Sequence, residues 1–247
     1  MPDAPHLIGL AAVVLAAFVV ESSLGFGATV VTVALGSLLV PTTELLAAFV
    51  PLNVVLSAYL TLRYAKSVAW RTLALQVVPP FALGLPLGIF LFRSLGTGGL
   101  ARAFGVFVVV LALVELTGSL RAGPTRARPL PTMVRAVLLT LAGVVHGIFA
   151  TGGPLVVFVM RREEPDGGKF RATLSALWLV MNVILTLTYA TSGAITNNSL
   201  TTTALLAPAL LLGTIIGEKL HRTLAGPAFQ RMVLALLLIA GLILALR

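Results

Sequence analysis

The sequence predicts an all-α polytopic membrane protein made of two repeats with inverted topology. Three features lead to this prediction: long apolar segments, a biased distribution of basic residues, and a repeat within the chain. Hydrophobic residues make up 58% of the 247 residues, and charged residues only 10%. Soluble domains carry about 25% charged residues, so this chain lacks the charge that a water-facing surface needs. We therefore expect its surface to contact the lipid bilayer.

Apolar segments occupy nearly the whole chain. They cover residues 7–40, 44–64, 72–93, 100–120, 132–160, 171–191, 200–222 and 228–247. Six of them have the length of one transmembrane helix, which needs about 20 residues. The first and the fifth are longer, and each is interrupted in the middle by glycine and polar residues. Each of these two is therefore either one long tilted helix or a hairpin of two short helices.

The basic residues favour the hairpins. If both long segments return to the side on which they start, four loops share one face and hold 14 of the 17 Lys and Arg residues. These loops are 63–71, 121–135, 161–171 and 219–231. Two single crossings would instead divide the basic residues 7 against 10. Because cytoplasmic loops are enriched in Lys and Arg, we expect hairpins, about 8–10 membrane segments, and both termini on the non-cytoplasmic side.

An internal repeat relates the two parts of the chain. At an offset of 125 positions, residues 57–69 and 182–194 are identical at seven of thirteen positions. After four extra residues in the second copy, a pair of glycines four residues apart that begins at Gly84 aligns with a pair that begins at Gly213. The predicted domains are thus an N-terminal repeat, a cytoplasmic linker and a C-terminal repeat, at residues 7–120, 121–131 and 132–247.

Each predicted repeat contains one hairpin and three further spans. This is an odd number of net crossings, so the second repeat must be inserted upside down relative to the first. Inverted repeats with discontinuous helices at corresponding positions are typical of secondary transporters, whose binding sites lie near the middle of the membrane.

The two interruptions are the predicted substrate-binding site. A helix that begins inside the membrane presents backbone N–H groups and the positive end of its dipole, which suits an anion. Glycine allows the backbone to approach a ligand closely. The alternative is that the glycines only permit tight helix packing. The candidate binding residues are Ser22, Ser23, Gly25, Gly27, Thr29, Thr151, Gly152 and Gly153, together with Ser57 and Asn182, which are matched across the repeat.

Glu21 and His146 occupy matching positions in the two interruptions. A carboxylate within the hydrocarbon region costs about 3 kcal/mol or more, and an imidazole changes charge near physiological pH. Both residues are therefore candidates for proton coupling. The alternatives are that Glu21 lies at a wet entrance and that His146 is a hydrogen-bonded packing residue.

The sequence predicts no enzyme, no cofactor and no metal site. It has no cysteine and three histidines, and it contains none of the HExxH, GxSxG or Walker motifs. The energy for transport would therefore come from an ion gradient. The net charge of +9 is explained by the basic loops, so we do not expect nucleic acid as a partner.

The two interruptions, which read GFGA at residues 25–28 and TGGP at residues 151–154, resemble those of the TauE/SafE sulfite exporter family. The resemblance covers nearly the whole chain and rests mainly on the two halves that each open with a broken helix. Ala28 stands where another glycine is common in the family, and the second motif ends in Pro154. The resemblance implies transport of small sulfur-containing or organic anions, including sulfite and sulfonates.

The sequence as a whole therefore predicts a secondary transporter of the inner membrane. It would bind a small anionic substrate and work by alternating access, with proton coupling through Glu21 or His146 as an additional hypothesis and the coupling ion left open. Three alternatives stay open: a passive anion channel, an exporter of another small metabolite, and a membrane scaffold without cargo.

Overall fold

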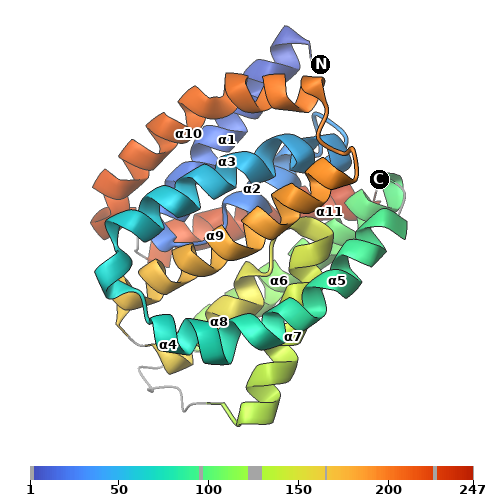
Figure 1. Ribbon diagram of the computed structural model, residues 1–247. Helices are drawn as coiled ribbons and strands as arrows, with labels where there is room; N and C mark the ends of the chain where they lie inside the picture. The colour runs from blue at the N-terminus through green and yellow to red at the C-terminus, as the bar shows by residue number, and fades with distance from the viewer. Residues whose placement is uncertain (1–2, 95–96, 122–129, 165, 225–226, 247) are drawn as a thin grey trace. The chain divides into compact units, whose positions relative to one another are not determined.

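The computed structural model describes residues 3–94, 97–121, 130–164, 166–224 and 227–246 (Figure 1). These residues form helices and short connections, with no β-strand among them. Most of the predicted linker at 121–131 lies outside the described residues.

In the first half of the chain, the long apolar segment at residues 7–40 forms two helices. Three further spans follow them. The helices are α1 (Ala4–Leu24), α2 (Ala28–Gly36), α3 (Thr42–Arg63), α4 (Trp70–Thr72), α5 (Val78–Ser94) and α6 (Thr97–Arg121). A 3-10 turn, η1 (Ala65–Ser67), precedes α4, and a π-helical turn, η2 (Leu73–Val77), joins α4 to α5. The π-helical turn comes immediately before Pro79 and Pro80, which have no N–H to continue a regular hydrogen-bond ladder.

The second half follows the same order. Its helices are α7 (Thr132–Phe149), α8 (Gly153–Glu163), α9 (Gly167–Thr191), α10 (Asn197–Leu224) and α11 (Pro227–Leu246). The long apolar segments at 7–40 and 132–160 are both broken, as predicted, into α1 with α2 and α7 with α8.

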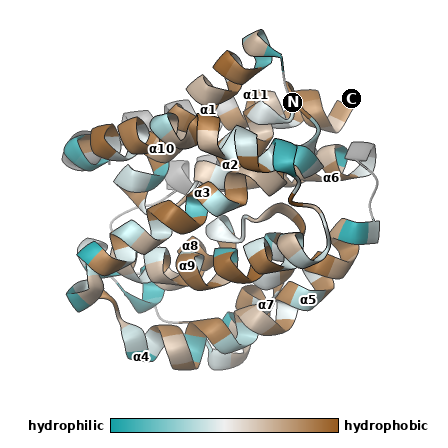
Figure 2. Cartoon of the chain, turned by 45° about the horizontal axis from the view of Figure 1, so that its top comes forward, coloured by the Kyte–Doolittle hydropathy of each residue, from teal (hydrophilic) through white to brown (hydrophobic). Residues whose placement is uncertain are grey.

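Six helices within the described ranges are long and apolar enough to cross a membrane. They are Ala4–Leu24, Thr42–Arg63, Trp70–Ser94, Thr132–Phe149, Gly167–Thr191 and Asn197–Leu220. Figure 2 shows how hydrophobic residues dominate these helices. On α5, Leu83 and Phe90 are 76% and 65% exposed, as expected for side chains that contact lipid. The prediction of an all-α polytopic membrane protein is confirmed.

The chain forms two compact units, and each takes segments from both halves. Unit 1 contains Met1–Phe49, Leu95–Thr125 and Ser192–Arg247. Unit 2 contains Val50–Ser94 and Arg126–Thr191. The first interruption therefore belongs to unit 1 and the second to unit 2.

In unit 1, α1 packs along α10 with their backbones in close contact (Figure 1). A Cβ atom at Gly213 would lie 2.6 Å from the carbonyl oxygen of Leu15. One turn later, a Cβ atom at Gly217 would lie 2.6 Å from the carbonyl oxygen of Val19. These glycines are required because any side chain would force the two helices apart.

In unit 2, α5 packs along α7 in the same manner (Figure 1). A Cβ atom at Gly84 would lie 2.0 Å from the carbonyl oxygen of Thr140, and one at Gly88 would lie 2.2 Å from that of Val144. Gly84 and Gly88 are the residues that align with Gly213 and Gly217 in the sequence repeat. In each unit, therefore, the second of the three further spans of one half packs on the first hairpin helix of the other half.

Each broken pair is a hairpin whose second helix runs back along the first. In unit 1, a Cβ atom at Gly36, the last residue of α2, would lie 3.2 Å from Leu10 near the start of α1. In unit 2, the guanidinium of Arg135 near the start of α7 lies 3.2 Å from the carboxylate of Glu163 at the end of α8. Both hairpins thus bring the ends of their segments together, as the basic residues predicted.

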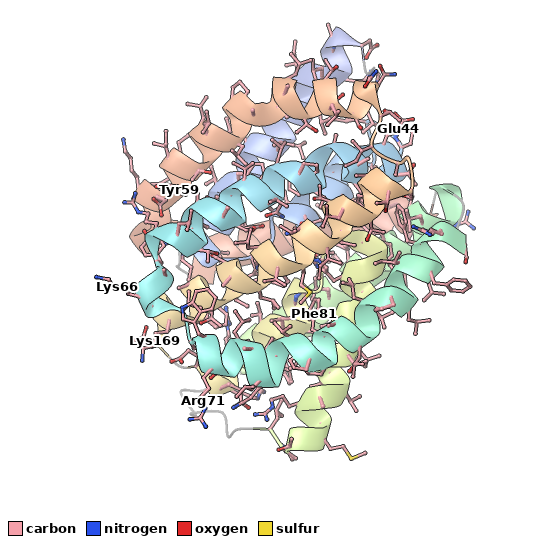
Figure 3. All side chains as sticks on the ribbon, in the orientation of Figure 1. Glu44, Tyr59, Lys66, Arg71, Phe81 and Lys169 are labelled. Carbon is pink, nitrogen blue, oxygen red and sulfur yellow. The ribbon has the colours of Figure 1, made fainter. Side chains whose placement is uncertain are left out.

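Described residues from three of the four basic loops lie near one another in unit 2. The Arg171 guanidinium at the start of α9 lies 5.1 Å from the ring centroid of Tyr64, and the Ala69 N–H donates to the Thr173 hydroxyl at 2.9 Å. The Arg135–Glu163 ion pair joins loop 121–135 to loop 161–171. Figure 3 labels three of the basic residues in these loops, Lys66, Arg71 and Lys169.

The close contact of α5 with α7 leads to a stability prediction for Gly84→Ala. Alanine favours a helix over glycine by about 1 kcal/mol, but here its Cβ would lie 2.0 Å from a backbone oxygen. Overpacking costs about 1–3 kcal/mol, so we expect a lower midpoint of thermal unfolding in detergent. The control is Gly167→Ala, where the added Cβ meets nothing within 4 Å, and it should not lower the midpoint. An equal midpoint for both variants would contradict the observed packing.

Candidate functional site

The first interruption, in unit 1, begins with a left-handed residue at the end of α1. Gly25 has φ of 86°, and its N–H donates to the carbonyl oxygen of Glu21 at 2.7 Å. Gly27 has φ of 109°, and α2 begins at the next residue. Side chains are strained at such φ values, so both glycines are needed for the chain to reverse here.

The side chain of Glu21 caps the start of α2. Its Oε2 atom accepts a hydrogen bond from the Ala28 N–H at 2.9 Å, and the residue is 4% exposed. The first N–H groups of a helix have no partner within the helix, and an acidic group at this end is favoured by the helix dipole. Glu21 therefore serves as an internal cap on the broken helix.

The hydroxyl residues next to Glu21 have different environments. The Ser23 hydroxyl donates to the Val19 carbonyl at 2.7 Å and lies 3.0 Å from the Gly217 carbonyl on α10. Ser22 is fully buried, and its hydroxyl has no partner among the described residues. Thr29, in the first turn of α2, is 5% exposed. Ser23 thus connects the hairpin to α10, and binding of substrate by Ser22 stays a prediction.

The second interruption, in unit 2, has the same construction. Ala150 at the end of α7 has φ of 53°, and its N–H donates to the carbonyl oxygen of His146 at 2.7 Å. Ala150 is the one residue other than glycine with positive φ in the described part of the chain. Gly152 is the N-cap of α8, and Pro154 lies in the first turn of that helix. Proline suits this position because the first turn does not need its N–H.

The side chain of His146 caps the start of α8. Its Nδ1 accepts the Gly152 N–H at 3.3 Å, and the residue is completely buried. The imidazole stacks on the Trp178 ring at a centroid distance of 5.7 Å and meets the edge of the Phe81 ring at 5.4 Å. Phe81 is labelled in Figure 3. The Nε2 atom of His146 has no hydrogen-bond partner in the described part of the protein.

The two interruptions therefore correspond residue by residue at the offset of 125. Gly25 and Ala150 are the left-handed ends of the first helices, and Glu21 and His146 cap the second helices. The matching of Glu21 with His146 was visible in the sequence, but their capping role was missed. The sequence did contain a signal for this role, namely a polar side chain six or seven residues before the point at which the second helix begins.

The remaining predicted binding residues are distributed as follows. Thr151, Gly152 and Gly153 are buried in the turn that leads into α8. Ser57, on α3 in unit 2, is 1% exposed and donates to Asn53 Oδ1 at 3.4 Å. Asn182 on α9 is also 1% exposed, and its Oδ1 has no partner within the described ranges. Binding of one substrate by both interruptions stays a prediction.

Phe81 and a cavity in unit 1 are features that the sequence did not reveal. Phe81 is one of twelve phenylalanines in an apolar chain, so no signal distinguishes it. The cavity measures about 320 Å³, and its polar lining includes Glu44, Asn198, Ser199 and Thr202. Thr196 and Ser199 cap each other across the start of α10, through N–H to hydroxyl distances of 2.8 and 3.2 Å. Among the described residues, no group of three His, Asp or Glu side chains could hold a metal ion.

Comparison with known proteins finds a matching family and a curated relative. The family model of the sulfite exporter TauE/SafE matches residues 10–244. The relative is the probable inner membrane transporter protein TsaS of Comamonas testosteroni, which is 28% identical over 179 residues covering 72% of each chain. No solved structure gives a significant match. Since the family model spans nearly the entire chain, including both broken helices, the chain belongs to the sulfite exporter TauE/SafE family of membrane transporters.

Proposed function

We propose that this chain is a secondary transporter that exports small sulfur-containing or organic anions, such as sulfite or sulfonates, across the inner membrane. The observation that carries the proposal is the pair of broken helices, each of which begins again at a glycine-containing turn flanked by buried polar residues. Family membership supports the class of substrate. The inner-membrane assignment is supported by the name of the relative from Comamonas testosteroni.

The chemistry of the two turns supports an anion rather than a cation as substrate. Helix N-termini offer N–H donors and the positive end of a dipole. The turn before α8 adds the hydroxyl of Thr151, and Gly152 and Gly153 leave the backbone uncovered by side chains. The corresponding residues before α2 are Ser22, Ser23, Gly25, Gly27 and Thr29. Binding at both turns during alternating access rests on the sequence repeat.

The transport prediction is tested with protein reconstituted in liposomes. The protein should move sulfite or a sulfonate with saturable kinetics, and Gly27→Leu and Gly152→Leu should each abolish the flux. Gly27 has φ of 109°, and a Cβ atom at Gly152 would lie 2.5 Å from the Ala142 carbonyl oxygen, so either leucine would distort a turn. Gly167→Leu, at a position with nothing within 4 Å of an added Cβ, is the matched control and should transport normally.

Two results would contradict this assignment. Normal flux in both leucine variants would show that the turns are not the binding region. Flux that neither saturates nor supports exchange between labelled and unlabelled substrate would indicate a passive channel in place of a carrier.

Proton coupling through Glu21 or His146 is the second part of the proposal. Both side chains are buried at the helix restarts, where a change of protonation would alter the local charge directly. We expect a pH gradient to drive accumulation of substrate in liposomes, and either Glu21→Gln or His146→Gln to abolish accumulation. The same variant should still exchange substrate at equal pH. Gradient-driven accumulation that survives in both variants would contradict proton coupling through these residues.

A further inference from the structure

The cavity in unit 1 is separate from both broken-helix turns. It lies beside the first turns of α3 and α10, and every residue that lines it belongs to unit 1. Its volume is about 320 Å³, which is at the small end of the range of about 300–1,000 Å³ for small-molecule sites. No residue from 21–29 or 146–154 lines it. The cavity therefore has room for a small ligand away from the proposed anion site.

Glu44 is the one charged residue that lines this cavity. It lies in the first turn of α3, is exposed, and is labelled in Figure 3. It forms no hydrogen bond or ion pair with another described residue. Because no Lys, Arg or His residue lines the cavity, the carboxylate is not balanced by a positive charge there. The cavity thus favours a cation and disfavours the anions proposed as substrate.

The hydroxyl groups of the cavity wall act as acceptors. Ser199 donates its hydroxyl proton to the Thr196 carbonyl at 2.8 Å. Thr202 donates its own to the Asn198 carbonyl at 2.9 Å. With these protons used inside α10, the two oxygens have only lone pairs left, and an ionised carboxylate such as Glu44 is likewise an acceptor. The wall is therefore suited to a ligand that brings its own N–H donors.

The start of α10 does not offset this preference. The N–H groups of Thr196 and Ser199 donate to each other's hydroxyl oxygens, at 2.8 and 3.2 Å, so neither is available to an anion. The rest of the wall is apolar and includes Leu10 and Leu45, which are each 1% exposed. No aromatic residue lines the cavity, so it lacks the aromatic rings that bind quaternary ammonium groups.

We infer that this cavity binds a small organic cation that carries a primary ammonium group on a short alkyl chain. The ammonium group donates to the Glu44 carboxylate and to Thr202 Oγ1, and the alkyl chain lies against Leu10 and Leu45. The site is independent of the proposed anion transport. In the predicted topology the first turns of α3 and α10 are on the non-cytoplasmic side, so the ligand would enter from there.

The probe for this site is n-butylammonium chloride, titrated calorimetrically into the full chain in detergent at constant ionic strength and neutral pH. We expect saturable binding to one site. Each methylene removed from the alkyl chain should weaken binding about fourfold, because about 0.8 kcal/mol accompanies burial of one CH₂ group. Tetramethylammonium has the same charge but no N–H, and it should bind about tenfold more weakly or less. Sodium methanesulfonate should not compete with n-butylammonium.

Two substitutions test the residues assigned to the ammonium group. Glu44→Gln keeps the shape of an exposed side chain but removes its charge, and it should weaken n-butylammonium binding about tenfold or more. The matched control is Glu164→Gln, which removes the same charge from unit 2 and should leave the affinity unchanged. Thr202→Val keeps the branched shape and removes the acceptor oxygen, so it should weaken binding severalfold.

Unchanged affinity in Glu44→Gln would overturn the inference. Equal binding of tetramethylammonium would also overturn it, because the hydrogen-bond acceptors would then play no part. Competition by methanesulfonate would identify the cavity as an anion site and would overturn it as well. Should Thr202→Val fail to fold, the Glu44→Gln titration and the alkyl series still decide.

Discussion

The structure depends on satisfying the backbone where two membrane helices are broken. Water is scarce inside a bilayer, so unpaired N–H and C=O groups are tolerated only where protein groups or a water-filled cavity surround them. At both breaks, the same three structural features stabilise the interrupted backbone. A left-handed residue at Gly25 or Ala150 returns its N–H to the preceding turn, a side chain of that turn caps the next helix, and the second helix runs back along the first. The second helices are short, with 9 residues in α2 and 11 in α8, and these caps provide partners for the N–H groups at which the helices begin.

Glycine contacts hold the capped hairpins in place. Helices in lipid gain little from hydrophobic burial against one another, so small residues that permit close packing contribute much of the attraction. In unit 1, Gly217 lies against Val19, two residues before the capping Glu21. In unit 2, Gly88 lies against Val144, two residues before the capping His146. In each unit, a close contact between helices thus lies about half a turn from the capping residue, and this contact helps to position the side chain that caps the second helix.

The sequence predicted the helical class, the two broken segments and the glycine pairs, because these features follow from local composition and a repeat. It did not predict the caps. The bond from Glu21 to Ala28 spans seven residues through two left-handed glycines, and no periodicity encodes that turn. Nor did it predict that α10 packs on α1 and α5 on α7, because the Gly-x3-Gly pairs identify a close contact without naming the partner. Phe81 and the cavity lined by Glu44 depend on such long-range pairing, so they emerge only from the structure.

Equivalent positions in a duplicated fold can share a structural task and still differ in chemistry. An ionised carboxylate only accepts hydrogen bonds, whereas a neutral imidazole accepts through one nitrogen and donates through the other. Glu21 caps α2 through one of its carboxylate oxygens, which accepts the Ala28 N–H. When His146 caps α8, its second nitrogen still presents a proton, and that proton is buried without an acceptor. Glu21 and His146 therefore share the capping of a helix start and differ in the hydrogen-bonding groups that they provide.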